Sequence, residues 1–352
     1  MLYFPMLRTK KGELNALTSL KPMSINVVRP ILQVPPPELD WDGNRVSANW
    51  EYVTKVANAL QSVLSFDSYL KCYLDVSAAK LNSALLSDLL FGIARYGGIP
   101  RPVFSLTGAE EYAKLHRQLI GIPKKSIIRV TLNEMTGRLM RSVKTALLNY
   151  QLDEAKTFVM LDMGDISDEK LPINLYETAI VGAVSQLARL NLAGIILTST
   201  ALPTSILTVP KWKPTYFDRR EVDIFKRVCT DADYDLHFGD YATGSVDIEP
   251  TTIRLGSPKV RYTLPTKYEV YKGEKPGRSP NTMAEQFQRI SEHLVQQPEY
   301  SGADFSWGDD FIYQASLPGN HPRGNATTWV TVNTSHHIEM IVSMLPSMKY
   351  DF

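Results

Sequence analysis

Along the first 240 residues, short apolar runs alternate with longer stretches in which apolar positions recur every three or four residues. The runs are rich in β-branched and aromatic residues and are typical of buried strands, whereas the longer stretches have the spacing of amphipathic helices. The runs cover residues 2–7, 25–34, 70–77, 102–106, 127–132, 157–163, 193–198 and 235–238. The helical stretches cover residues 12–20, 50–64, 82–96, 110–120, 139–152, 175–190 and 218–228. The pattern therefore predicts a repeated strand–helix unit.

Eight such units favour a closed (β/α)8 barrel of the TIM-barrel type. Parallel strands require helical crossovers, and successive right-handed crossovers curl a sheet until it closes at eight strands. The runs are apolar on both faces, as expected where helices cover the outside of the sheet and side chains fill its centre. An open, doubly wound sheet is the alternative. We predict an α/β fold with the barrel in residues 1–241 and a C-terminal α+β extension, residues 242–352, packed on it.

The pattern changes in the C-terminal third of the chain. Residues 260–271 alternate as an exposed antiparallel strand does, and residues 283–297 have helical spacing. We expect the latter segment to supply the eighth outer helix. Residues 311–315 and 328–333 have the composition of strands, and residues 338–345 form a short apolar segment.

Composition narrows the classes of function. The 38 Lys and Arg residues nearly balance the 37 Asp and Glu residues, so the net charge is only +1. Proteins that bind nucleic acids mainly through phosphates usually have a basic excess or a basic stripe, and the sequence shows neither. The two isolated cysteines, Cys72 and Cys229, are typical of a reducing compartment. Because no apolar run is long enough for a membrane helix or a secretion signal, we expect a cytoplasmic protein that binds neither membranes nor nucleic acids.

Functional groups of a (β/α) barrel gather at the carboxyl ends of its strands, so residues near the ends of the apolar runs are the candidates. The candidate catalytic residues are Asp75, Asp162, Asp165 and His237. The candidate ligand-binding residues are Arg8, Lys10, Arg129, Asp240 and Tyr241. Asp162 and Asp165, two carboxylates at one strand end, could hold a divalent metal with His237 two strands away, or act as acid and base. The more common role of such residues is structural, because Asp often caps a helix or turns the chain and a lone His is often a hydrogen-bonded core residue.

A second polar grouping lies near the C-terminus. It comprises Ser306, Asp309, Asn325, Trp329, His336 and His337. On a strand, adjacent histidines would face opposite sides and could not readily share one metal ion. We therefore favour the interpretation that this grouping is a polar cluster that stabilises the extension, over the interpretation that it is a ligand site.

Standard catalytic fingerprints do not occur in the chain. The sequence has no G-x-G-x-x-G after a strand, no G-x-x-x-x-G-K-[ST], no H-E-x-x-H and no G-x-S-x-G. These absences lower the odds of a dinucleotide oxidoreductase, a P-loop enzyme, a zincin protease and a standard serine hydrolase.

Both ends of the chain resemble a known family. Residues 3–8 (YFPMLR), followed by K-G-E-L at residues 11–14 and P-I-L at residues 30–32, resemble the start of the Beta-protein family. The F-S-x-G-D-x-x-I pattern of residues 305–312, with Gly324-Asn325, Trp329 and His336-His337 after it, is similar to the family's closing pattern. The resemblance implies a phage-encoded or bacterial anti-phage system. The family's namesake is encoded next to a killing protein, which it is expected to restrain. The resemblance implies no catalytic residues.

Two hypotheses of function follow. The first is an immunity-like or antitoxin-like regulator of a defence system that binds a partner protein, such as a toxin or effector encoded nearby. The second is a barrel enzyme that acts on a phosphate-bearing small molecule or nucleotide, with or without a divalent metal. The enzyme hypothesis requires the candidate residues at the strand ends to converge in one site, because fold alone does not decide between the two.

Overall fold

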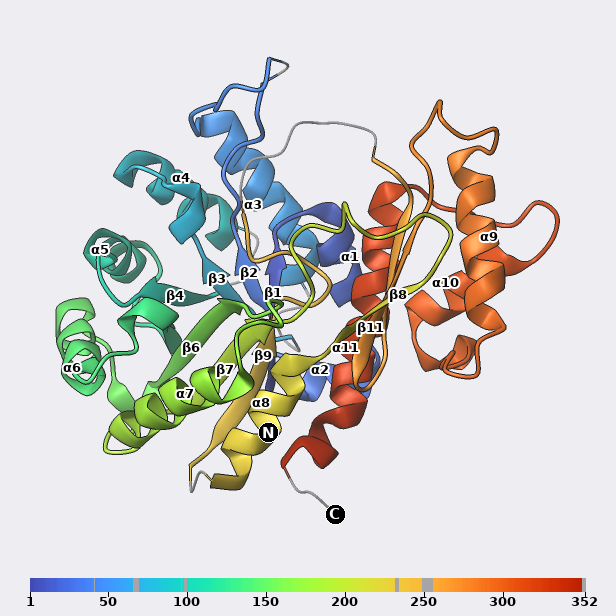
Figure 1. Ribbon diagram of the computed structural model, residues 1–352. Helices are drawn as coiled ribbons and strands as arrows, with labels where there is room; N and C mark the ends of the chain where they lie inside the picture. Colours follow the sequence, from blue (N-terminus) through green and yellow to red (C-terminus); the bar gives the residue numbers. More distant parts are fainter. Residues whose placement is uncertain are drawn as a thin grey trace.

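The computed structural model is a closed barrel of eight parallel strands with an attached C-terminal extension (Figure 1). It describes residues 1–40, 42–65, 70–95, 97, 100–231, 234–248 and 256–349. In barrel order the strands are β1 (Tyr3–Arg8), β2 (Ile31–Gln33), β3 (Tyr73–Asp75), β4 (Arg101–Ser105), β5 (Ser126–Thr131), β6 (Thr157–Asp165), β7 (Gly194–Thr200) and β9 (Leu236–Asp240). Pairing of Phe4 with Gly239 closes the barrel between β1 and β9. The predicted barrel is therefore confirmed, and the open sheet is excluded.

Seven helices that follow barrel strands lie around this barrel. They are α1 (Lys11–Thr18), α3 (Trp50–Leu64), α4 (Ser83–Ala94), α5 (Glu110–Leu119), α6 (Leu139–Tyr150), α7 (Ile173–Leu187) and α8 (Arg220–Asp231). Several begin where the sequence offers a cap: the side chain of Asn49 accepts from the backbone N–H of Tyr52, and that of Asn82 accepts from Leu85. These caps fix where the chain leaves the strand ends and enters the helices.

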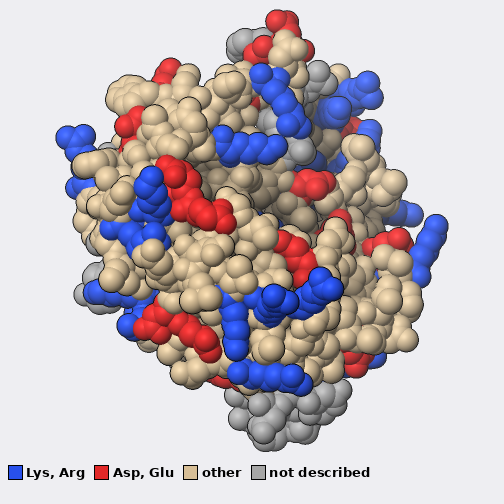
Figure 2. All heavy atoms as spheres, turned by 90° about the vertical axis from the view of Figure 1, so that its left-hand side faces the viewer, with Lys and Arg blue, Asp and Glu red and all other residues tan. Residues whose placement is uncertain are grey.

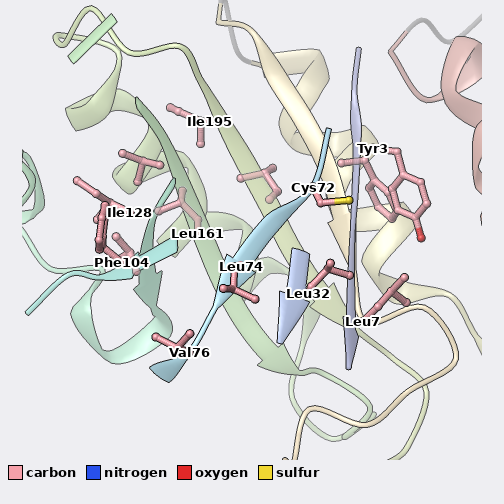
Figure 3. Packing of buried hydrophobic residues seen from close by; sticks show 14 of the residues in the cluster. Tyr3, Leu7, Leu32, Cys72, Leu74, Val76, Phe104, Ile128, Leu161 and Ile195 are labelled. Atoms are coloured by element: carbon pink, nitrogen blue, oxygen red, sulfur yellow. The ribbon is translucent and has the colours of Figure 1, made fainter. Parts of the chain in front are cut away.

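Strand alternation divides the core into two parts. On β1, Phe4 and Met6 belong to the cluster that fills the barrel, whereas Tyr3 and Leu7 belong to the layer between strands and helices. Figure 3 shows this outer layer, with Leu32 and Leu74 among its members. Burying each branched aliphatic side chain contributes about 1.5–3 kcal/mol, so these two clusters supply most of the driving force for closing the barrel.

The segment predicted as the second strand is only partly extended. Residues 25–27 belong to the short helix α2 (Pro22–Val27), and β2 is limited to Ile31–Gln33. Pro22 occupies the first turn of α2, where its missing N–H costs no helical hydrogen bond. The correction arises because an apolar run does not by itself distinguish a buried helical turn from a strand.

The C-terminal extension contains a small antiparallel sheet and three longer helices. The sheet has the order β10 (Lys259–Thr263), β11 (Lys267–Lys272) and β8 (Thr215–Asp218). Residues 260–271, expected to be one exposed antiparallel strand, are antiparallel but form two strands, and most of their central residues are buried. Strand β8 comes from the segment between β7 and α8, so the barrel itself supplies the third strand. The helices are α9 (Met283–Val295), α10 (Trp307–Ser316) and α11 (Ala326–Lys349).

The eighth outer helix is α11, and not the segment 283–297 that we expected. Helix α11 packs against α1, α8 and strand β1, whereas α9 packs against α10. The segments 311–315 and 328–333, expected to be strands, lie within α10 and α11. Helix α11 is buried along much of its length, and a helix surrounded by protein lacks the one-sided apolar stripe that identifies a surface helix.

Glycines allow α11 to approach its neighbours closely. A Cβ atom on Gly12 would lie 2.8 Å from the backbone oxygen of Thr327, and one on Gly308 would fall on the carbonyl group of Val332. Gly308→Ala is therefore expected to lower the free energy of unfolding by about 2 kcal/mol or more, because α10 must move away from α11. Thermal or urea unfolding measures the effect. The control is Gly182→Ala on α7, where an added Cβ meets no atom within 4 Å and unfolding should not become easier; equal losses in the two variants would contradict the packing argument.

No helix in the described part of the chain is both long enough and apolar enough to cross a membrane.

Candidate functional site

Four of the candidate residues form one cluster at the carboxyl end of the barrel, which we call the strand-end cluster. It consists of Asp75, Arg129, Asp162 and Tyr241, from β3, β5, β6 and the residue that follows β9. Nη1 of Arg129 lies 3.0 Å from Asp75, and its Nη2 lies 2.6 Å from Asp162. The Tyr241 hydroxyl lies 2.7 and 2.8 Å from the two oxygens of Asp162. The sequence therefore brings these four residues together as expected.

The electrostatics of the cluster shift the pKa values of Arg129 and Tyr241. Burial by itself would lower the pKa of Arg129, but the charges of Asp162 and Asp75 raise it above its ordinary value. Burial and the neighbouring charge of Asp162 raise the pKa of Tyr241 well above its ordinary value. Arg129 is therefore a permanent cation and Tyr241 a permanent hydroxyl donor near neutral pH.

The carboxylates of the cluster are already occupied. Asp75 accepts from the backbone N–H and the hydroxyl of Ser77, at 3.0 and 2.6 Å, besides pairing with Arg129. Asp162 also accepts from the backbone N–H of Gly164 at 3.0 Å. Each carboxylate oxygen thus has at least one donor. As arranged here the cluster is a structural ion-pair network and provides no free base.

The segment after β9 is held over the mouth of the barrel. The guanidinium group of Arg8 donates to the backbone oxygens of Ser245 and Asp247, at 3.1 and 2.7 Å. Arg261, from β10, donates to the backbone oxygen of Thr243. One cation from the barrel and one from the extension therefore hold this segment in place. Arg8, predicted to bind a ligand, serves the protein's own backbone here.

A carboxyl group lies next to these two arginines. Glu13 accepts a hydrogen bond from the backbone N–H of Arg8, and burial raises the pKa of Glu13 to about 7 against the opposing charge of Arg8. Burial and the nearby charge of Arg8 lower the pKa of Arg261 to about 10. Glu13 and Arg261 were not predicted as site residues, because nothing in the sequence pattern places α1 and β10 beside each other.

Like Arg8, the candidates Lys10, Asp165 and His237 lie outside the cluster. Lys10 forms an exposed ion pair with Glu38 at 3.5 Å. Asp165 accepts from the hydroxyl of Thr204 and from the backbone N–H of Ser167, so it links two loops. His237 lies at the other end of the barrel, where its Nδ1 accepts from the backbone N–H of Leu2 at 3.3 Å.

The position of His237 corrects the expectation that it shares a site with the two carboxylates. Strand β9 runs from Leu236 to Asp240, so His237 is near its beginning. Its ring packs 5.8 Å from that of Phe4 and 5.5 Å from that of Phe158, in the amino-terminal part of the barrel core. The apolar run ends at residue 238, whereas β9 continues to Asp240, so the run alone places His237 at the wrong end of the strand.

Asp240 faces outward and connects the barrel to the extension. Its Oδ1 accepts from the hydroxyl of Tyr3 at 2.6 Å, and its Oδ2 lies 2.9 Å from Nε2 of His337. Nδ1 of His337 lies 2.8 Å from the hydroxyl of Thr263 in β10. We call these four buried residues the barrel–extension network. Burial by itself would raise the pKa of Asp240, but His337, Tyr3 and Arg219 lower it below its ordinary value.

The C-terminal polar residues occupy four separate environments. Asp309 accepts from the hydroxyls of Tyr262 and Ser306 and lies 2.8 Å from Nδ1 of His336. Asn325 caps α11 by accepting from the backbone N–H of Thr328.

Trp329, also on α11, stacks on Phe287 with ring centroids 4.5 Å apart. His337 belongs to the barrel–extension network instead. All of these contacts are internal to the protein, in keeping with a stabilising role for this grouping.

A divalent metal has no evident place among these residues. Within the described ranges, no three His, Cys, Asp or Glu side chains are grouped so that they could hold a metal ion. The carboxylates proposed as ligands, Asp162 and Asp165, do not form such a group with His237. Asp162 is paired with Arg129, Asp165 accepts from Ser167 and Thr204, and His237 lies at the other end of the barrel.

Comparison with known proteins identifies one family. The family model described as Beta protein matches residues 3–343. Two solved structures are similar in fold. The Ignisphaera aggregans GH53 catalytic domain is 9% identical, with a TM-score of 0.36 over 67% of this chain and 84% of that chain. The GH18 chitinase ChiB from the chitin utilization locus of Flavobacterium johnsoniae is 12% identical, with a TM-score of 0.33 over 96% and 93% of the two chains. No curated protein matches the chain.

Proposed function

Because the chain belongs to the Beta protein family, we propose that it is an immunity-like or antitoxin-like regulator in a phage-encoded or bacterial anti-phage system. It would act by binding a partner protein, a toxin or effector encoded nearby. The barrel would then serve as a rigid scaffold that presents a binding surface on its loops.

The observation that carries this proposal is a set of exposed leucines at the carboxyl end of the barrel. They are Leu132, Leu171, Leu175 and Leu207, and they follow the three adjacent strands β5, β6 and β7. Leu207 is 82% exposed and Leu175 is 58% exposed. Leu132, Leu171 and Leu207 lie in the segments after these strands, and Leu175 lies in the first turn of α7. Exposed leucines are unfavourable in water, and where they form one surface they mark a site that another protein covers. We call these four residues the leucine rim.

The loops that carry the leucine rim are held in fixed positions. The guanidinium group of Arg220 donates to the backbone oxygens of Ile166 and Asp168, at 2.8 and 2.6 Å, and also to that of Leu171. Asp165 and Thr204 join the loops after β6 and β7 at 3.1 Å. A surface organised in advance loses less conformational entropy on binding, which favours affinity.

Charge supports a protein partner over a nucleic acid. Figure 2 shows Lys and Arg side chains interspersed with Asp and Glu over the visible face of the molecule, without a continuous basic stripe. This distribution agrees with the net charge of +1. A partner that binds here would be selected by shape and apolar contact more than by a field of one sign.

The alternative, a barrel enzyme acting on a phosphate-bearing small molecule, needs an available acid or base. The only carboxylates of the strand-end cluster, Asp75 and Asp162, are held by Arg129, and His237 lies at the opposite end of the barrel. We therefore prefer the binding role.

The test uses the product of the adjacent gene as the partner. We expect co-expression to relieve that product's toxicity and the two proteins to co-purify. Leu175→Glu and Leu207→Glu are each expected to weaken the complex about thirtyfold, because a buried hot-spot residue is worth about 2 kcal/mol. Affinity is measured by biolayer interferometry with the purified partner.

Leu148→Glu is the matched control. Leu148 is 77% exposed but lies on α6, away from the leucine rim, so this variant should bind normally. Loss of binding in all three variants would point to a general solubility effect. Failure of the wild-type protein both to co-purify with its neighbour and to relieve toxicity would refute the proposed function.

A further inference from the structure

The groups without partners at the strand ends are hydrogen-bond donors. Nε2 of Gln33 is buried and has no hydrogen-bond partner in the described part of the chain, and Gln33 as a whole is 2% exposed. The register pairs Gln33 with Asp75 on β3, so both side chains point to the inside of the barrel. An unpaired buried amide is costly, which indicates that an acceptor absent from the chain itself belongs beside it.

Arg129 also has a donor to spare. Its Nε and Nη2 groups donate to Asp162 and Tyr241, and one Nη1 N–H donates to Asp75. A guanidinium group has five N–H bonds, so the second Nη1 N–H has no partner among the described residues. The side chain of Arg129 is 18% exposed, so a bound molecule can reach it. The carboxylates of the same cluster, by contrast, already accept hydrogen bonds at every oxygen.

A cavity lies between the loops that follow β3 and β4, and it is lined by neighbours of the strand-end cluster and not by Gln33 or Arg129 themselves. Its volume is about 460 Å³, and its lining includes Ser77, Lys80, Ser83 and Ser105. Ser77 bonds directly to Asp75, and Ser105 is paired in register with Arg129. The cavity therefore borders the strand-end cluster, and Gln33 lies one strand further along the barrel.

The outer part of this cavity is positively polarised. Lys80 lines it and makes no hydrogen bond or ion pair with the described residues. Helix α4 begins beside it at Ser83, and of its first free N–H groups only that of Leu85 is capped, by Asn82. Helix N-termini attract anions through such groups. Glu111, an acidic residue on the cavity wall, is paired with Lys114 at 4.0 Å.

We propose that this end of the barrel binds a small molecule that carries a phosphate group. The phosphate would lie between Lys80 and the N-terminus of α4. The rest of the molecule would extend over Ser105 and Arg129 and place an acceptor at Gln33. The volume is within the usual range for sites of small ligands, about 300–1,000 Å³. The cavity lies after β3 and β4, whereas the leucine rim follows β5, β6 and β7. The two sites are formed by different loops, so the ligand proposal does not rest on the proposed partner.

The test is isothermal titration calorimetry of the full chain with five compounds: inorganic phosphate, ribose 5-phosphate, adenosine monophosphate, ribose and adenosine. We expect at least one phosphate ester to bind at least tenfold more tightly than the same compound without its phosphate. Lys80→Gln is expected to weaken that binding about tenfold, as loss of a charge-assisted contact does. If inorganic phosphate binds as tightly as the phosphate esters, the site recognises only the anion, and the proposed larger ligand is refuted.

Gln33→Met separates ligand binding from a structural role. Methionine has a similar length and no donor, so the variant should fold at least as stably as the wild type and bind the ester several-fold more weakly. Lys144→Gln, at an exposed lysine of α6, is the control for loss of one surface charge. Unchanged affinity in Gln33→Met would mean that ordered water satisfies the amide. That result, or the absence of binding by any phosphate compound, would overturn the proposal.

Discussion

Replacing Arg129 by methionine is expected to lower the free energy of unfolding by about 3–5 kcal/mol at neutral pH. The substitution keeps the length of the side chain but leaves Asp75 and Asp162, both almost fully buried, without the cation between them. A buried carboxylate with no counter-charge is among the most destabilising groups that a single substitution can create. Urea unfolding followed by circular dichroism measures the loss.

Two further variants show whether charge is the cause. The triple variant Asp75→Asn, Arg129→Met, Asp162→Asn removes both negative charges with the positive one, and it should recover most of the lost stability. Arg141→Met, at an exposed arginine of α6, should change stability by less than about 0.5 kcal/mol. If the triple variant is as unstable as Arg129→Met, packing of the arginine stem would be responsible, and the electrostatic explanation would be wrong.

The second large effect is expected at Asp240. Asp240→Ala removes the acceptor for both Tyr3 and His337, which are fully buried, and so breaks the barrel–extension network. We expect a loss of about 3–5 kcal/mol at pH 7. Asp223→Ala, at an exposed aspartate of α8, is the control and should have little effect. The measurement is again urea unfolding.

The contribution of Asp240 should also depend on pH. Its pKa in the folded protein is below the ordinary value, because His337, Tyr3 and Arg219 outweigh the effect of burial. A group with a lowered folded pKa stabilises the protein fully above its unfolded pKa, about 3.9, and loses that contribution as the pH falls through the folded pKa. The difference between wild type and Asp240→Ala should therefore be constant from pH 7 to about 5 and shrink below about pH 4. A difference that widens on acidification would show that the pKa is raised instead.

The repeating pattern was sufficient to predict the barrel. Each of the eight apolar runs contributes a strand to the closed sheet, because a parallel strand buried on both faces must be apolar throughout. The pattern also predicted that residues at the carboxyl ends of the strands lie near one another, since these ends share one face of a barrel. Of the candidates, Asp75, Arg129, Asp162 and Tyr241 meet there, whereas Lys10 and Asp165 do not join them. The pattern placed His237 at the wrong end of the barrel, because the position of this residue along β9 depends on where that strand begins. A shift of a few residues reverses the conclusion, and local composition does not define strand limits that closely.

The extension was the part least accessible from the sequence. Residues such as Val330, Thr331 and Val332 have the composition of a strand, yet they lie in α11. Helix propensities differ by less than about 1 kcal/mol per residue for most side chains, so tertiary packing readily overrides them. What held this segment as a helix was the space beside α1 and α8, together with the missing side chain at Gly12.

The sequence by itself determined the periodic pattern of apolar residues. That pattern sets how many strand–helix units close into a barrel and which residues lie near the ends of the strands. Only the tertiary structure decided which helix completes the outer ring, which donors at the strand ends are left without acceptors, and which carboxylates are neutralised. Those outcomes depend on contacts between residues such as Tyr3 and His337, more than 300 positions apart in the sequence. Periodicity is a property of neighbouring residues, whereas charge pairing and close approach exist only after distant segments have been brought together.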